Sequence, residues 1–140
     1  MKELKGTILK NLEYMEKSFY FENIIAWQKA HAFVLSVYTL TKKFPQDELF
    51  ALTSQFRRAA VSIEANIAEG CKKLSKADKL RFLNISEGSL EECRDYIVLS
   101  RDLEYISPDD FECLKDLSNQ AGWFLNSYVK GIQNNSGIKD

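Results

Sequence analysis

Apolar residues recur at intervals of three and four positions along most of this chain, and this spacing keeps one face of a helix directed inward. The clearest runs predict four long helices, at residues 23–43, 47–70, 75–105 and 108–131. A weaker pattern within residues 1–20 indicates an N-terminal arm or a short helix, with its apolar positions at Leu4, Ile8, Leu12 and Met15. The sequence therefore predicts an all-α protein.

Residues that start and stop helices stand at the ends of these runs. Pro45 disfavours a helical conformation in the residue before it, and Asp47 is placed to cap the next helix. Gly70 can adopt the left-handed conformation that closes a helix. Ser75 begins a serine-to-aspartate capping pattern, and Ser107 precedes a proline and two acids, which is a strong signal for a helix start.

The connections between the four predicted helices contain only a few residues each. Such short loops leave no length for a crossover, so consecutive helices must run in opposite directions. We therefore expect an antiparallel up-and-down four-helix bundle at residues 21–132. The polar tail at residues 133–140 is expected to be disordered.

The predicted helix at residues 47–70 carries two separate apolar faces on a wheel of about 100° per residue. The expected core face contains Leu49, Leu52, Phe56, Ala60, Ile63 and Ile67. The roughly opposite face is built mostly of small residues, which allow another helix to approach closely: Phe50, Val61, Ala65 and Ala68. A polar stripe between the faces contains Gln55, Arg58, Ser62, Asn66 and Glu69, with Arg57 and Glu64 at the other edge.

This polar stripe has two interpretations. It is either a pocket in which Arg58 and Glu69 bind or process a ligand, or a subunit interface in which the polar groups pair with one another and with a second chain. We favour the interface, because Ser62 has no histidine at a helical neighbour position that could act as its base. His31 lies near the core stripe of its own helix and is expected to be a packed residue. Gly88, in the middle of a predicted helix, indicates the close approach of another helix, since glycine weakens a helix by about 1 kcal/mol relative to alanine.

Charge is distributed unevenly along the 140 residues, although the formal net charge is only -1. Residues 57–81 contain seven Lys or Arg against three Asp or Glu, and residues 82–116 contain three against ten. These segments are either solvated helix faces that pair with each other or a basic patch able to contact nucleic acid. The basic residues concerned are Arg57, Arg58, Lys72, Lys73, Lys76, Lys79 and Arg81.

Several kinds of chemistry lack a signature in this sequence. The three cysteines, Cys71, Cys93 and Cys113, are widely spaced and indicate neither a disulfide framework nor a zinc site. There are no Glu-x-x-His pairs for a di-iron centre and no glycine-rich phosphate loop. No signal peptide or membrane span is indicated. We therefore expect a cytoplasmic protein that is not an enzyme and has no cofactor, metal or small-molecule substrate.

Three blocks of the sequence resemble a known family. They read FENIIAWQKAHAFVLSVYTLTKKFP, LTSQFRRAAVSIEANIAEG and FLNISEGSLEECRDYI, and they are similar to the four-helix bundle proteins encoded in intervening sequences of bacterial 23S rRNA genes. The resemblance implies a ring-shaped homopentamer and a relationship to the accessory variability determinant of diversity-generating retroelements, which binds nucleic acid and partners a reverse transcriptase. The signature positions are Gln55, Arg57, Arg58, Ser62, Asn66, Glu69, Gly70, Gly88 and Ser89.

Two hypotheses for function follow from the residues and the resemblance. The first is a non-enzymatic, self-assembling bundle for scaffolding or partner binding, whose interface includes these signature positions together with Val61, Ala65 and Ala68. The second is a nucleic-acid-binding accessory protein that acts with RNA or a reverse transcriptase through the seven basic residues. The retroelement proteins are strongly basic, whereas this chain has a pI of about 5.9. We therefore favour self-assembly, because binding to a phosphate backbone depends on positive charge.

Overall fold

The described chain is entirely helical, with no strand. The computed structural model describes the backbone of residues 1–140 and every side chain except those of residues 12–17. It contains five α-helices, α1 (Lys2–Lys17), α2 (Ile25–Thr41), α3 (Leu52–Lys72), α4 (Lys76–Asp102) and α5 (Pro108–Gln133), and two 3-10 turns, η1 (Tyr20–Asn23) and η2 (Gln46–Glu48). The all-α prediction is confirmed, and the structure contains a fifth α-helix, α1, in the segment for which the sequence indicated an arm or a short helix.

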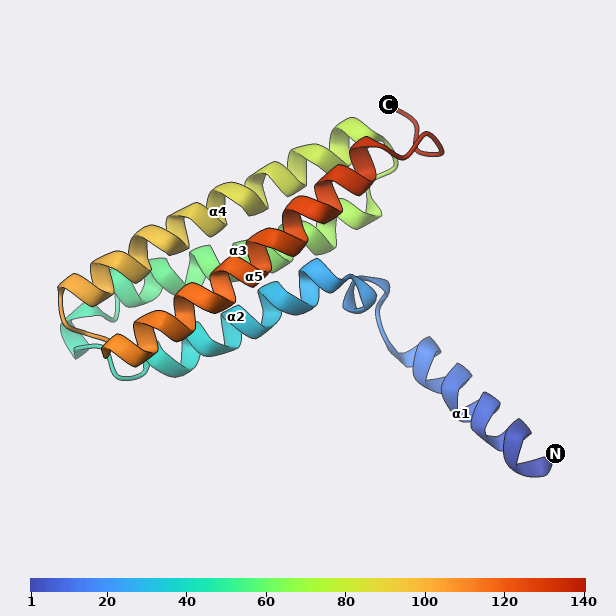
Figure 1. The fold of residues 1–140 in the computed structure, drawn as a ribbon, viewed down its shortest axis with the longest axis horizontal. Coiled ribbons are helices and arrows are strands. Elements are labelled where there is room, and N and C mark those ends of the chain that lie inside the picture. Colours follow the sequence, from blue (N-terminus) through green and yellow to red (C-terminus); the bar gives the residue numbers. More distant parts are fainter.

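Helices α2 to α5 lie side by side, and each packs against two of the others. The contacting pairs are α2 with α3, α3 with α4, α4 with α5, and α5 with α2. Figure 1 shows these helices alternating in direction along the chain, joined by short loops at the two ends. α3 and α4 are therefore neighbours that each turn one side outward, and this arrangement positions the candidate site.

The core lies between these four helices. Its largest fully buried side chains are apolar and come from all four, as helical spacing of three and four requires; they include Phe33, Phe56, Ile63, Ile67, Leu83, Leu114 and Leu125. Burial of a side chain of this size contributes about 1.5 to 3 kcal/mol to folding. The core positions of α3 that the sequence predicted are confirmed, with one exception at Leu49.

The start of α3 differs from the prediction. The chain forms the 3-10 turn η2 after Pro45, and α3 begins only at Leu52, so Asp47 does not cap it. Glu48 is close enough instead for its carboxylate to accept a hydrogen bond from the Leu52 amide at 3.2 Å. Leu49 therefore lies outside the helix, with 36% of its surface exposed, and does not belong to the core.

The prediction that Gly70 closes α3 by adopting a left-handed conformation was also wrong. α3 continues to Lys72, and Gly70 does not have a positive φ. A Cβ on Gly70 would lie 3.2 Å from Phe82 Cβ and 3.4 Å from the Lys79 carbonyl oxygen. Glycine is needed here because α4 approaches α3 closely, and not because the helix ends.

The starts of α4 and α5 follow the capping prediction. The Ser75 and Ser107 hydroxyls each accept a hydrogen bond at 3.1 Å, from the amides of Asp78 and Asp110 respectively. At its other end α4 stops at Asp102, three residues earlier than predicted. Glu104 then has a φ of 61°, which is the left-handed conformation that often closes a helix.

Both ends of the chain lie outside the four packed helices. The tail predicted to be disordered is residues 133–140, of which Gln133 is the last residue of α5. The rest of the tail folds against the start of α4, where the Lys76 amide donates a 2.6 Å hydrogen bond to the Lys139 carbonyl and Ile138 packs against the core. α1 projects away from the helices in Figure 1, and Leu4 and Ile8 are 64% and 49% exposed. The side chains of Leu12 and Met15, the other two predicted apolar positions, lie outside the described residues.

Candidate functional site

The side of α3 that faces away from the core is the surface that the sequence singled out. We call it the outward face of α3 and define it by Arg58, Val61, Ala65, Ala68 and Glu69. Arg58, Val61, Ala65 and Glu69 are exposed, and Ala68 is half-buried. Phe50, immediately before the helix, is 93% exposed. The predicted second apolar face is therefore open to solvent in a single chain.

Most of the polar stripe beside this face is paired within the chain. The Ser62 Oγ lies 2.8 Å from Ser89 Oγ of α4, and the Asn66 amide donates to the Ser62 carbonyl at 2.8 Å and to its hydroxyl at 3.1 Å. A polar seam thus joins α3 to α4. For Ser62, Asn66 and Ser89, which the sequence assigned to an interface between subunits, the structure supplies partners inside one subunit.

The same seam continues toward the N-terminal end of α3 as a shallow cavity. The Tyr96 hydroxyl lies 2.6 Å from Glu92 Oε1 and 3.3 Å from Gln55 Oε1. The hydrogen bond to the Glu92 carboxylate is the main reason that the pKa of Tyr96 is raised to about 12, with partial burial adding to it. The cavity has a volume of about 300 Å³ and is lined by Gln55, Arg58, Ala59, Ser62, Ser89, Glu92 and Tyr96.

Sequence reasoning missed Tyr96 and Glu92. A signal was present, since the two residues are four apart and therefore neighbours on one face of a helix. Their position opposite Gln55, however, depends on how α3 and α4 are aligned along their length, and the sequence pattern of a single helix does not predict that alignment.

The two adjacent arginines have different environments. Arg57 Nε donates a 2.9 Å hydrogen bond to Thr41 Oγ1 on α2, and the guanidinium lies 4.8 Å from the centroid of the Tyr38 ring. Arg58 is exposed and has no hydrogen-bond, ion-pair or ring partner among the described residues. Arg57 therefore holds α2 against α3, and Arg58 is free to contact another molecule.

The pocket proposed to use Arg58 and Glu69 together is not formed. Arg58 lines the cavity at Tyr96, whereas Glu69 lines a separate hollow of about 610 Å³ with Phe19, Tyr20 and Lys72. The two residues are three helical turns apart on α3, and no described contact joins them. This arrangement does not assemble a catalytic pair.

Two of the predicted nucleic-acid contacts lie on the ring of Phe82. Lys73 Nζ and the Arg81 guanidinium are 4.9 Å and 5.2 Å from its centroid. Arg81 also forms an exposed ion pair with Asp78 at 3.5 Å. Both charges therefore have a partner within the chain.

Two further basic residues hold helix ends. Lys79 Nζ donates to the Cys71 carbonyl at 3.0 Å, and Lys76 Nζ donates to the Gln133 carbonyl at 3.2 Å. Cations at these positions favour the negative ends of α3 and α5. Together with Arg57, Lys73 and Arg81, five of the seven predicted contacts have structural roles, and Arg58 and Lys72 are the two without described partners.

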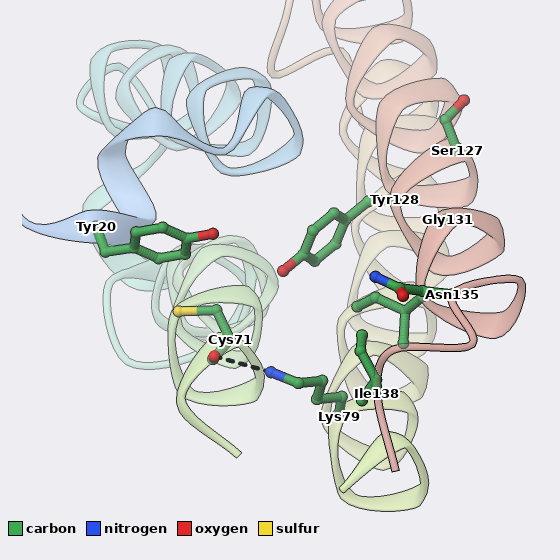
Figure 2. Close-up of a pocket in the computed structure, with 9 residues that line it drawn as sticks. Tyr20, Cys71, Lys79, Ser127, Tyr128, Gly131, Asn135 and Ile138 are labelled. Carbon is green, nitrogen blue, oxygen red and sulfur yellow. Dashed lines mark hydrogen bonds between the residues drawn. The ribbon is translucent and has the colours of Figure 1, made fainter. Parts of the chain in front are cut away.

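A third cavity, of about 370 Å³, is lined by residues of η1, of the C-terminal ends of α3 and α5, and of the start of α4. Figure 2 shows Tyr20 and Tyr128 pointing toward one another across it, with the Lys79 ammonium hydrogen-bonded to the Cys71 carbonyl. Burial, with the proximity of Cys71 and Tyr20 adding to it, raises the pKa of Tyr128 to about 12. Burial also raises the pKa of the Cys71 thiol, against the opposing effect of Lys79 and Lys72.

The remaining candidates for chemistry are structural. His31 Nδ1 lies 2.7 Å from Glu64 Oε2, and its ring stacks on Trp27, so it links α2 to α3 from a half-exposed position. Cys93 is fully buried, and burial raises the pKa of its thiol to about 12. Within the described residues, no group of three or more His, Cys, Asp or Glu side chains could hold a metal ion. Nor is any described helix both long and apolar enough to cross a membrane.

Gly88 does not have the environment predicted for it inside one chain. It is exposed, in the middle of α4, and a Cβ at this position would meet nothing within 4 Å. No described helix of the same chain approaches it. Packing within the described chain gives no reason for a glycine at this position.

Comparison with known proteins identifies the family. A search of curated proteins finds no match to this chain. A solved structure of a protein of unknown function from the S23 ribosomal protein family of Bacteroides thetaiotaomicron is similar to this one, with a TM-score of 0.70 and 27% identity, over 76% of this chain and 96% of that chain. The model of the family described as 23S rRNA-intervening sequence protein matches residues 22–127. The chain therefore belongs to the family of 23S rRNA-intervening sequence proteins.

Proposed function

We propose that this protein is a non-enzymatic, self-assembling four-helix bundle of the cytoplasm that acts as a scaffold or binds a partner. In this proposal α2 to α5 form an up-and-down antiparallel bundle, and copies associate into a homo-oligomer, a pentameric ring by family resemblance. The observation that carries the proposal is the outward face of α3, where Val61 and Ala65 are exposed on a helix whose opposite side is fully buried.

The composition of this face suits a protein contact. Val61 is 37% exposed and the neighbouring Phe50 is 93% exposed, so covering both would remove apolar surface from water, at a gain of about 25 cal/mol per Å². Ala65 and Ala68 are small enough to let another helix approach closely. The unpartnered Arg58 beside them is the residue type that is enriched at protein interfaces.

The seam between α3 and α4 supports the same proposal. Because Ser62, Asn66 and Ser89 are hydrogen-bonded to one another, the surface beside them is held in one arrangement before a partner binds. A preorganised surface loses less conformational entropy on association. These three paired side chains at the edge of the face need no partner from a second copy when the face is covered.

Substitution of a small residue on the outward face of α3 tests the proposal. Ala65→Glu and Ala68→Glu place a carboxylate where the second copy would pack, and we expect the oligomer to dissociate while the helical content measured by circular dichroism stays largely unchanged. Gln120→Glu, which adds the same charge on an exposed position of α5, is the matched control. Light scattering that shows a wild-type monomer at micromolar concentration, or intact oligomers of the Ala65→Glu and Ala68→Glu variants, would contradict the proposal.

Nucleic-acid binding is a second candidate. The observation in its favour is that Lys72 and Arg58 are exposed and unpartnered in a segment with an excess of positive charge. Repetition of that segment around a ring would make weak contacts multivalent. Titration with structured RNA at low and moderate salt tests it, because binding through phosphates weakens as salt rises. Lys72→Glu should weaken such binding. RNA binding that does not change with salt concentration, or no binding at low salt, would count against a nucleic-acid-binding function.

A further inference from the structure

We infer that the contact between copies joins two different surfaces, with the outward face of α3 on one copy against the outward face of α4 on the next. This inference rests on the proposed self-assembly and specifies its geometry. We define the outward face of α4 by Ile85, Gly88, Glu92, Asp95 and Leu99, which follow one another at spacings of three and four and are all exposed.

The outward face of α4 contains apolar surface that its own chain leaves uncovered. Ile85 is 47% exposed and Leu99 is 41% exposed. Both lie on the side of α4 opposite to its buried residues, such as Leu90 and Ile97. Together with Gly88 between them, they form a shallow apolar strip along the helix.

Gly88 is the residue that this contact explains. Glycine in a helix interior is less favourable than alanine, and nothing in the chain lies within 4 Å of where its Cβ would be. Gly70 shows the contrasting case, in which the packing of α4 on α3 inside one chain already excludes a side chain. A backbone from a second copy lying over Gly88 would account for the glycine as α4 accounts for Gly70.

Each face carries one charge that can pair with the other across the contact. Arg58 on the outward face of α3 and Asp95 on that of α4 are both exposed, and neither has a described partner in its own chain. The segments that contain them carry opposite net charge, positive for residues 57–81 and negative for residues 82–116. A pairing of α3 with α3 would place Arg58 opposite Arg58 or Glu69 of the second copy and would leave Asp95 unpaired.

The outward face of α2 is one competing surface. Ile25 and Leu35 on it are 52% and 57% exposed, but α2 contains no acidic residue and its one lysine, Lys29, lies over the Phe124 ring. It therefore offers no charge to pair with Arg58. The acidic outward face of α4 fits the unpartnered arginine better.

Pairing two different faces also limits the kind of assembly. Contacts between unlike surfaces generate rings when the rotation closes and filaments when it does not. α3 and α4 are neighbours in the bundle and turn outward in different directions. Each copy is therefore rotated relative to the last, as it is in both a closed ring and a helical filament.

Mixing two variants tests the inference. Ala65→Glu blocks only the α3 face and Gly88→Glu blocks only the α4 face, and both positions are exposed, so both chains should fold. We expect each variant alone to be monomeric by analytical ultracentrifugation. An equimolar mixture should give a dimer of one copy of each variant, because one intact α3 face and one intact α4 face remain between them.

The possible failures are distinguishable. A wild-type monomer would overturn the proposed self-assembly itself. Three results would overturn the α3–α4 pairing while leaving self-assembly intact. They are a Gly88→Glu variant whose oligomer has the wild-type mass, a mixture that stays monomeric, and loss of assembly only on Leu35→Glu. A second variant, Gly88→Ala, should raise the free energy of unfolding of the single chain yet weaken assembly. If Gly88→Ala raises both the free energy of unfolding and the strength of assembly, no backbone approaches Gly88.

Discussion

The Ser62 and Ser89 hydroxyl oxygens lie 2.8 Å apart and join α3 to α4 beside the exposed face of α3. Ser62 is half-buried and Ser89 is 9% exposed, so water competes little for this hydrogen bond. The Asn66 side chain donates to the Ser62 hydroxyl as well, at 3.1 Å, so three side chains form one network. The pair holds the surface on which assembly is proposed to depend.

A double-mutant cycle on this pair should report a coupling within one subunit. Ser62→Ala and Ser89→Ala are each expected to lower the free energy of unfolding, with a coupling energy of about 1 kcal/mol, as for a typical hydrogen bond. Urea unfolding of the four chains under conditions where they are monomeric measures it. If the effects are simply additive, the hydroxyls do not interact in the folded monomer.

Arg57 and Arg58 should separate stability from assembly. Arg57→Ala removes the bond to Thr41 and the contact with the Tyr38 ring, so we expect it to lower the free energy of unfolding by about 1 kcal/mol. Arg58→Ala removes an unpartnered surface side chain and should change stability by less than about 0.5 kcal/mol, while weakening the oligomer. Thermal unfolding and light scattering on the same two variants decide this, and the opposite pattern would mean that their roles are exchanged.

Glu104 is a position at which glycine should stabilise the protein. Its φ of 61° is a left-handed conformation, which costs a residue with a Cβ about 1 kcal/mol. Glu104→Gly is therefore expected to raise the free energy of unfolding by up to about that amount. Leu103→Gly, where φ is -79°, is the matched control and should be destabilising. Equal effects from the two substitutions would show that the backbone conformation is not the cause.

Tyr128 should contribute to loss of stability at alkaline pH. Its folded-state pKa of about 12 lies above the ordinary value of about 10, so its contribution is fully present below pH 10 and is lost as pH rises toward 12. Tyr128→Phe should therefore flatten the fall in the free energy of unfolding between pH 10 and pH 12. Its hydroxyl has no hydrogen-bond partner among the described residues, so the variant should fold. Urea unfolding at several pH values checks this, and an unchanged slope would assign the effect to other groups, such as Cys93.

Local patterns predicted those features that local interactions produce. Ser75 and Ser107 cap α4 and α5 because a serine hydroxyl reaches an amide three residues on, whatever the rest of the chain does. The same reasoning was wrong for Asp47, where the chain forms a 3-10 turn before α3 begins. It was also wrong for Gly70, because glycine serves both to end a helix and to admit a neighbouring one, and the sequence signal for the two is the same.

The candidate site was predicted as a surface but not as a set of contacts. Helical periodicity identified Val61, Ala65 and Ala68 as a second apolar face. The positions of residues around one helix follow from its period alone and do not depend on the neighbouring helices. The contact of Gln55 with Tyr96, by contrast, joins positions far apart in the sequence. No pattern within either helix could have paired them.

The sequence by itself determined the helices, their buried faces and the apolar stripe on the far side of α3, because these depend on the period of one helix and on the chemistry of its caps. Only the tertiary structure decided that Arg57 is held by α2 while Arg58 is free, that Ser62 meets Ser89, and that Gly88 has no neighbour in its own chain. The physical reason is that periodicity states which way a side chain points, whereas its partner is set by the distance and alignment of the helix beside it.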